Sequence, residues 1–121
     1  MKENLLEAFR SLVECYDHLL AERDGNLTDE QRQFVRVAQR SAGLLPGIFD
    51  GSANENDIRL TLIYDCASPF ANQLQMAELF LEGMMGDLQD GQRKHFQRIE
   101  AISRQLLELR ANLVVAYRQE Q

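Results

Sequence analysis

Hydrophobic residues recur at intervals of three and four along most of this chain, which is the spacing of one face of a helix. The pattern predicts helices over about residues 2–23, 28–48, 57–85 and 89–118. No stretch alternates apolar and polar residues for long enough to indicate a strand. Four long helices joined by short turns predict an all-α fold, an antiparallel four-helix bundle made of two helical hairpins.

Turn and capping residues set the organisation of the chain. Gly25 and Asn26 end the first helix, and Thr28 with Gln31 has the spacing of a capping box that opens the second. The sequence FDGSANEND is the one convincing linker. We therefore expect a single domain over residues 1–121. Hairpin one covers about 2–49, the linker about 50–56 and hairpin two about 57–120. The interior positions expected on the second helix are Phe34, Val37, Ala38, Ser41, Leu44 and Leu45.

The stretch from Leu60 to Leu81 reads as part of one amphipathic helix with Pro69 in its first half. A proline inside a helix costs about 3 kcal/mol, because it removes a donor and crowds the carbonyl four residues back. The sequence therefore predicts that either packing or a useful kink compensates for this cost. Polar residues that precede the proline make this stretch the first candidate for a functional site; they are Tyr64, Asp65 and Ser68.

An internal repeat relates the two halves of the chain. A shift of 61 residues aligns LTDEQRQF (27–34) with LQDGQRKH (88–95) and gives eight identities, such as Gln31 with Gln92 and Phe9 with Phe70. Two helical hairpins with similar turns would look alike for this reason alone. The other interpretation is a duplication, in which one chain supplies both hairpins of a bundle.

Composition narrows the classes of function. The chain has 121 residues and a net charge of −6, and it contains no apolar run long enough to span a membrane. Nucleic acid is not an expected partner, because the basic residues of the last helix are interleaved with glutamates. Cys15 and Cys66 stand apart, with no cluster at zinc spacing, so we expect reduced thiols and no metal or other cofactor. The expected compartment is the cytoplasm.

The second half, residues 58–118, resembles the dimerisation and histidine-phosphotransfer domain of bacterial sensor histidine kinases. The segment Tyr64-Asp65-Cys66-Ala67-Ser68-Pro69-Phe70 resembles the H-box of that family. The stretches QMAELFLEGM (75–84) and LQDGQRKHFQRIEAISRQLLELRANLV (88–114) resemble the remainder of its two helices. Residues 27–45 of the first half resemble its second helix too. The resemblance implies a cytoplasmic helical bundle in two-component signalling.

The chain departs from that family at the chemistry. The register from Pro69 puts Tyr64 where the phosphoacceptor histidine would stand, with Asp65 in the acidic position and Ser68 in the Thr/Asn position. Within residues 1–121 we expect no nucleotide-binding domain, and no glycine-rich loop there could cradle phosphates. Kinase activity is therefore not expected. The remaining expectation is an adaptor that binds a response-regulator receiver domain or a histidine kinase.

The outer face of the third predicted helix is the expected contact. Met76 and Leu79 are large apolar residues on that face, and in the resembled family the receiver domain docks there. The predicted partner-binding residues are Tyr64, Asp65, Ser68, Asn72, Met76 and Leu79. His95 is expected to be a partly buried packing residue and His18 to be exposed.

The sequence leaves two other functions open, a phosphatase and a structural module. Asp65 with Ser68 or Asn72 could orient a water for hydrolysis of a receiver's aspartyl phosphate, since residues three apart share a helical face. The other alternative is a structural module in which self-association buries Met76 and Leu79. The chain would be a monomer with an intramolecular bundle, or a homodimer through an outer face.

Overall fold

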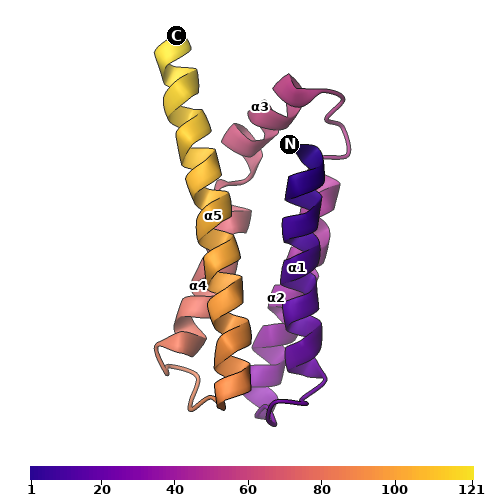
Figure 1. Cartoon of the computed structure of the whole chain (residues 1–121), viewed down its shortest axis with the longest axis vertical. Coiled ribbons are helices and arrows are strands. Elements are labelled where there is room, and N and C mark those ends of the chain that lie inside the picture. The colour runs from indigo at the N-terminus through magenta and orange to yellow at the C-terminus, as the bar shows by residue number, and fades with distance from the viewer.

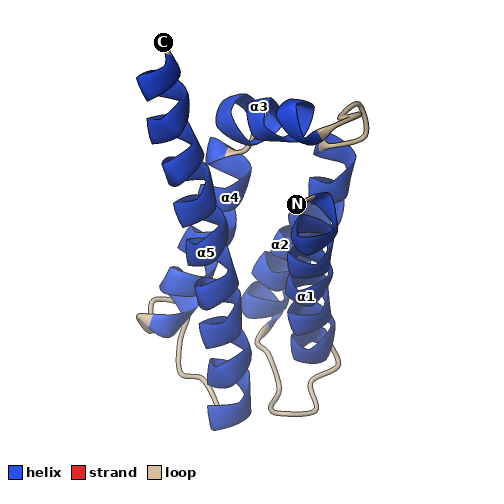
Figure 2. Ribbon diagram, turned by 45° about the horizontal axis from the view of Figure 1, so that its top comes forward, coloured by secondary structure: helices blue, strands red, loops and turns tan.

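The protein is described by a computed structural model that covers all residues from 1 to 121. It consists of five helices packed together and contains no strand, which confirms the all-α prediction (Figures 1 and 2). The helices are α1 (Lys2–Leu20), α2 (Asp29–Ile48), α3 (Glu55–Asp65), α4 (Ala67–Leu81) and α5 (Asp90–Glu120). Residues 49–54 connect α2 to α3, so the last two residues of the linker expected at about 50–56 belong to α3.

The long helices pack in pairs that run in opposite directions. Helix α1 packs against α2, and α4 packs against α5, each pair being joined by a short loop at the same end of the molecule (Figure 1). Helix α1 also contacts α5, and α2 contacts α4. Helix α3 crosses the opposite end and packs against α4 and α5, and the last turns of α5 project beyond the other helices (Figure 2).

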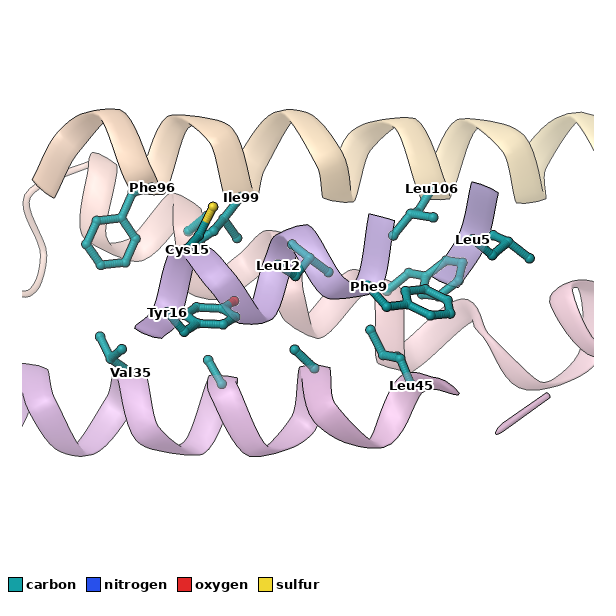
Figure 3. Packing of buried hydrophobic residues seen from close by; sticks show 14 of the residues in the cluster. Leu5, Phe9, Leu12, Cys15, Tyr16, Val35, Leu45, Phe96, Ile99 and Leu106 are labelled. Atoms are coloured by element: carbon teal, nitrogen blue, oxygen red, sulfur yellow. The ribbon is translucent and has the colours of Figure 1, made fainter. Parts of the chain in front are cut away.

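The hydrophobic core runs along the interior of the four long helices (Figure 3). Its largest fully buried apolar side chains are Tyr16, Phe9, Phe49, Phe70, Phe80 and Phe96. One polar connection crosses this core. The buried Tyr16 hydroxyl donates to Gln73 Oε1, and the Gln73 amide donates to the carbonyl oxygen of Ala38 at 3.1 Å. Because buried polar groups need partners, this chain of hydrogen bonds fixes α1, α4 and α2 relative to one another.

Two helices replace the single helix predicted over residues 57–85, because the helical conformation is interrupted at Cys66. Pro69 is the third residue of α4 and does not kink a longer helix. The N–H groups of a first helical turn have no intrahelical partner, so a proline there removes nothing that the helix needs. The next residue still donates normally, from Phe70 N to Cys66 O at 3.1 Å. The proline therefore opens α4, and the predicted cost inside a helix does not arise.

Arg110 of α5 caps the end of α3 that this break creates. Its Nε donates to the carbonyl oxygen of Leu62 at 3.0 Å, and its Nη2 donates to that of Ile63 at 2.7 Å. The last carbonyls of a helix lack intrahelical donors and carry partial negative charge, so a guanidinium satisfies both needs. Helix α3 is thereby held against α5.

The interior face of α2 differs from the predicted one. Ala38 and Leu45 are buried as expected, but Val37 is 50 % exposed and Leu44 is 72 % exposed. Phe34 and Ser41 are also exposed. The side chains that α2 buries instead, besides Ala38 and Leu45, are Gln31, Val35 and Ala42. Helix α2 carries two apolar stripes side by side, and hydrophobic spacing alone could not tell which one the core takes.

Burial repeats along the chain with the 61-residue offset found in the sequence. Ten pairs of positions at this offset are buried in both halves. They are Leu5/Cys66, Phe9/Phe70, Leu12/Gln73, Tyr16/Ala77, Leu19/Phe80, Gln31/Gln92, Val35/Phe96, Ala38/Ile99, Ala42/Ser103 and Leu45/Leu106. The equivalence therefore covers the interior of the fold, including positions whose residue types differ, and is not limited to the turns.

Candidate functional site

Met76 and Leu79 line an open groove between α2 and α4. One hollow of ≈ 270 Å³ lies between these two residues and Val37 of α2. A second hollow of the same size lies farther along, beside Leu44. The two hollows share Ser41 and Asn72, so they form one continuous depression. We call it the α2–α4 groove and define it by Val37, Ser41, Leu44 and Ile48 of α2 with Pro69, Asn72, Met76 and Leu79 of α4.

Each wall of this groove is a straight stripe along one helix. The wall residues follow one another by three or four positions on both helices, so they stack on one face. From Val37 to Ile48 the stripe measures about 16 Å at the helical rise of 1.5 Å per residue. Leu44 and Val37 are far more exposed than core residues of this size, which makes this groove the candidate interaction surface.

The predicted site residues divide among three places. Asn72, Met76 and Leu79 lie in the α2–α4 groove. Tyr64 lies on α3, where its hydroxyl donates to the hydroxyl of Tyr117 at 3.2 Å and the two rings meet edge to face. That hydrogen bond raises the pKa of Tyr64. The second place is therefore the contact between α3 and the projecting end of α5.

Asp65 and Ser68 lie at the break between the two helices. Asp65 is the last residue of α3 and Ser68 is the second residue of α4, and both are exposed. The expectation that residues three apart share a face requires one continuous helix, so it does not apply across Cys66. The side chains of Asp65, Ser68 and Asn72 form no hydrogen bond with one another.

The two cysteines are buried and unpaired. Burial raises the pKa of Cys66 to about 11, with a further contribution from the nearby Asp65 carboxylate. Burial also raises the pKa of Cys15, against the opposing effect of Arg98. Both thiols are therefore protonated at neutral pH, and a protonated thiol is a poor nucleophile. Their contribution is packing.

The face between α1 and α5 is the repeat-equivalent of the α2–α4 groove, but its chemistry is different. His18 and His95 stand where the groove side has Leu79 and Phe34, and their rings stack with centroids 5.2 Å apart. His95 Nε2 also lies 3.0 Å from Asp24 Oδ2. His18 is exposed and His95 half-buried, as the sequence predicts, whereas their stacking is not readable from either residue alone.

A hollow of ≈ 380 Å³ lies at the other end of this α1–α5 face, near the chain's first residues. It is lined by apolar residues such as Leu5 and Leu109, with Asn4 and Gln105 beside them. The apolar part of this face is thus confined to one end. No group of three or more His, Cys, Asp or Glu side chains is placed to hold a metal ion. No helix is long and apolar enough to cross a membrane.

Comparison with known proteins assigns no family to the chain. No protein-family model matches it, and neither a curated protein nor a solved structure matches it significantly.

Proposed function

We propose that the chain is a non-catalytic signalling adaptor that binds a two-component partner, such as a response-regulator receiver domain, through the α2–α4 groove. The observation that carries this proposal is the groove itself. Met76 and Leu79 line it with two exposed apolar residues of α2, Val37 and Leu44. The resemblance of residues 58–118 to a histidine-phosphotransfer domain supports the choice of partner.

We also infer that α1, α2, α4 and α5 form a four-helix bundle of two fused hairpins. Two observations support it: burial repeats at the 61-residue offset, and the hairpins pack on each other through α1 with α5 and α2 with α4. A single hairpin leaves an apolar face uncovered, so a two-helix module needs a second copy. In this chain the second hairpin takes that place.

A binding role without phosphoryl chemistry agrees with the residues at the H-box-like segment. Tyr64 stands in the place of the phosphoacceptor, and its hydroxyl is engaged with Tyr117. Asp65 and Ser68 are separated by the break at Cys66, so no observation favours the phosphatase alternative. What this segment contributes instead is the start of α4, which carries one wall of the groove.

The experiment is a titration of purified receiver domains and histidine kinase phosphotransfer domains against the full chain by isothermal calorimetry. Leu79→Asp should weaken binding at least about tenfold, because it puts a charge in the apolar contact. The matched control is His18→Asp, which introduces the same aspartate at the repeat-equivalent position on the α1–α5 face. Circular dichroism checks that both variants keep their helices.

The results separate the proposal from the structural alternative. Binding that is lost in Leu79→Asp and kept in His18→Asp supports the adaptor. Equal affinity in both variants, or no binding by any domain of either class, overturns it. Self-association that Leu79→Asp abolishes would instead favour the oligomerisation module.

A further inference from the structure

We propose that the α2–α4 groove holds one amphipathic helix of the partner, with carboxylates beside the apolar stripe of that helix. This inference rests on the proposed function and adds the kind of element that enters the groove. Shape, charge and the difference between the two faces of the molecule each support it.

The shape of the groove fits a helix. Its walls are two helical stripes, and the depression between them continues from Leu79 and Val37 to Ile48 and Pro69. A length of about 16 Å accommodates three turns of a helix at 5.4 Å per turn. An amphipathic helix that lays its apolar face into such a groove anchors itself by residues at i, i+3, i+4 and i+7.

The charge beside the groove is positive, although the whole chain carries −6. Helix α2 has no acidic residue from Gln31 to its end, and residues 66–77 of the other wall carry no charge at all. Arg40 follows Val37 by three positions and precedes Leu44 by four, so it adjoins the exposed stripe. Arg40 forms no salt bridge within the chain, whereas the charge of Arg36, one turn earlier, already acts on the Glu22 carboxylate. Carboxylates of a bound helix would be the counter-charges of Arg40.

The same charge disfavours a second copy of the chain as the occupant. A two-fold contact through this groove would bring Arg40 of each copy toward that of the other, and like charges in an interface weaken it. A partner helix with acidic flanks meets the opposite condition.

The equivalent α1–α5 face keeps only part of this stripe, because its apolar hollow is confined to the end beside Leu5 and Leu109. The positions that correspond to Val37 and Leu44 are Arg98 and Gln105, and the position of Leu79 is His18. The repeat would give two equivalent docking faces if both halves had kept the same residues. We therefore expect one helix bound per chain.

Two synthetic peptides test the charge and the stoichiometry without the natural partner. Both have about 15 residues and the same leucine stripe at i, i+3, i+4 and i+7, with glutamates flanking the stripe in one and lysines in the other. Fluorescence anisotropy with the full chain should give at least about tenfold tighter binding of the glutamate peptide. Calorimetry should give one peptide per chain.

Variants of the chain assign the preference to the groove. Arg40→Glu should remove or reverse the preference for the glutamate peptide, and Leu44→Asp should abolish binding of both peptides. Arg10→Glu, the same charge change on the exposed side of α1, should leave the preference intact. Equal affinity for the two peptides, or a preference that Arg40→Glu leaves unchanged, overturns the inference. Two peptides per chain, or dimers that Leu44→Asp dissolves, would also overturn it.

The outcome is independent of the choice of signalling partner. If receiver domains bind and Arg40→Glu has no effect on the peptides, the proposed function stands and the acidic helix is excluded. If the glutamate peptide binds as described and no receiver or phosphotransfer domain does, the helix-binding groove stands and the two-component assignment fails.

Discussion

Gln31 and Gln92 make the same contact from opposite hairpins. The Gln31 side-chain amide donates to the carbonyl oxygen of Met85 at 2.9 Å, and that of Gln92 donates to the carbonyl oxygen of Asn26 at 3.2 Å. Each glutamine thus lies in the first turn of its own helix and contacts the turn of the other hairpin. The two turns are joined by a reciprocal pair of hydrogen bonds whose donors, Gln31 and Gln92, are equivalent in the repeat, while the acceptors lie two positions apart in the two turns.

Gln31→Leu should lower the free energy of unfolding by about 1–3 kcal/mol, because it leaves a buried amide contact unmade. The side chain also accepts from the Thr28 N–H at 2.9 Å, so the capping box is lost together with the bond to Met85. Urea denaturation measures the change. The control is Gln33→Leu on an exposed position of the same helix, and a loss no larger than that of the control would contradict the role assigned to Gln31.

Arg110→Met should loosen α3 more than the rest of the molecule. It removes the two donors that cap the carbonyls of Leu62 and Ile63, at a cost of about 1–3 kcal/mol. Hydrogen exchange read by mass spectrometry should show faster exchange across residues 58–65 and little change in α1. Arg104→Met, which removes only exposed ion pairs, is the control. If hydrogen exchange in α3 is as slow in Arg110→Met as in the wild type, the cap does not hold this helix.

Two glycines inside helices should respond to alanine in opposite directions. Gly43 of α2 has open space around an added Cβ, so Gly43→Ala should stabilise the fold by about 0.5–1 kcal/mol. At Gly91 of α5 the Cβ would come within 2.6 Å of Asp24 Cβ, so Gly91→Ala should destabilise it by about 1–3 kcal/mol. Thermal unfolding of both variants checks the pair. The same sign of change in both would contradict the close approach of the turn to α5.

Stability should fall in acid partly through Glu22. Its carboxylate accepts from the Leu27 N–H at 2.8 Å and from Arg32 at 2.9 Å, and these contacts lower the pKa of Glu22 from its ordinary value of 4.5. A lowered folded-state pKa means that the unfolded chain takes up the proton first. The contribution is therefore complete above that value and is lost as the pH falls below it.

Glu22→Gln isolates this contribution. The amide oxygen can still accept from the Leu27 N–H, but it no longer titrates. The melting temperature of the variant should decline less than that of the wild type between neutral pH and the acid side of 4.5. Asp87→Asn, a change at an exposed carboxyl in the other turn, is the control. Parallel pH profiles for wild type and Glu22→Gln would exclude this origin of the acid sensitivity.

The fold class and the turns were predictable from the sequence because their signals are local. The capping box at Thr28 and Gln31 forms as predicted. The break at Cys66 was not predictable in the same way. Pro69 fits a kinked helix and a new helix equally well, and the residue that stabilises the break, Arg110, is 48 positions from Leu62.

The candidate site was predictable on one side only. Met76 and Leu79 were recognised as apolar residues on an outward face, and both line the groove. The opposite wall was missed, since Val37 and Leu44 follow helical spacing and were expected inside. The internal repeat is the signal that identifies Val37 and Leu44 as outward-facing. The equivalents of these two residues are Arg98 and Gln105, and polar residues at those positions indicate an outward face on both helices.

The central claim is that a signalling partner binds between α2 and α4. The most direct test is titration of the ¹⁵N-labelled full chain with an unlabelled receiver domain, followed by amide chemical-shift perturbation. The largest changes in amide chemical shift should fall on Val37, Leu44, Met76 and Leu79. The amides around His18 and His95 should be unperturbed. Shifts centred on the α1–α5 face or on the projecting end of α5, or no shifts at saturating receiver domain, would contradict it.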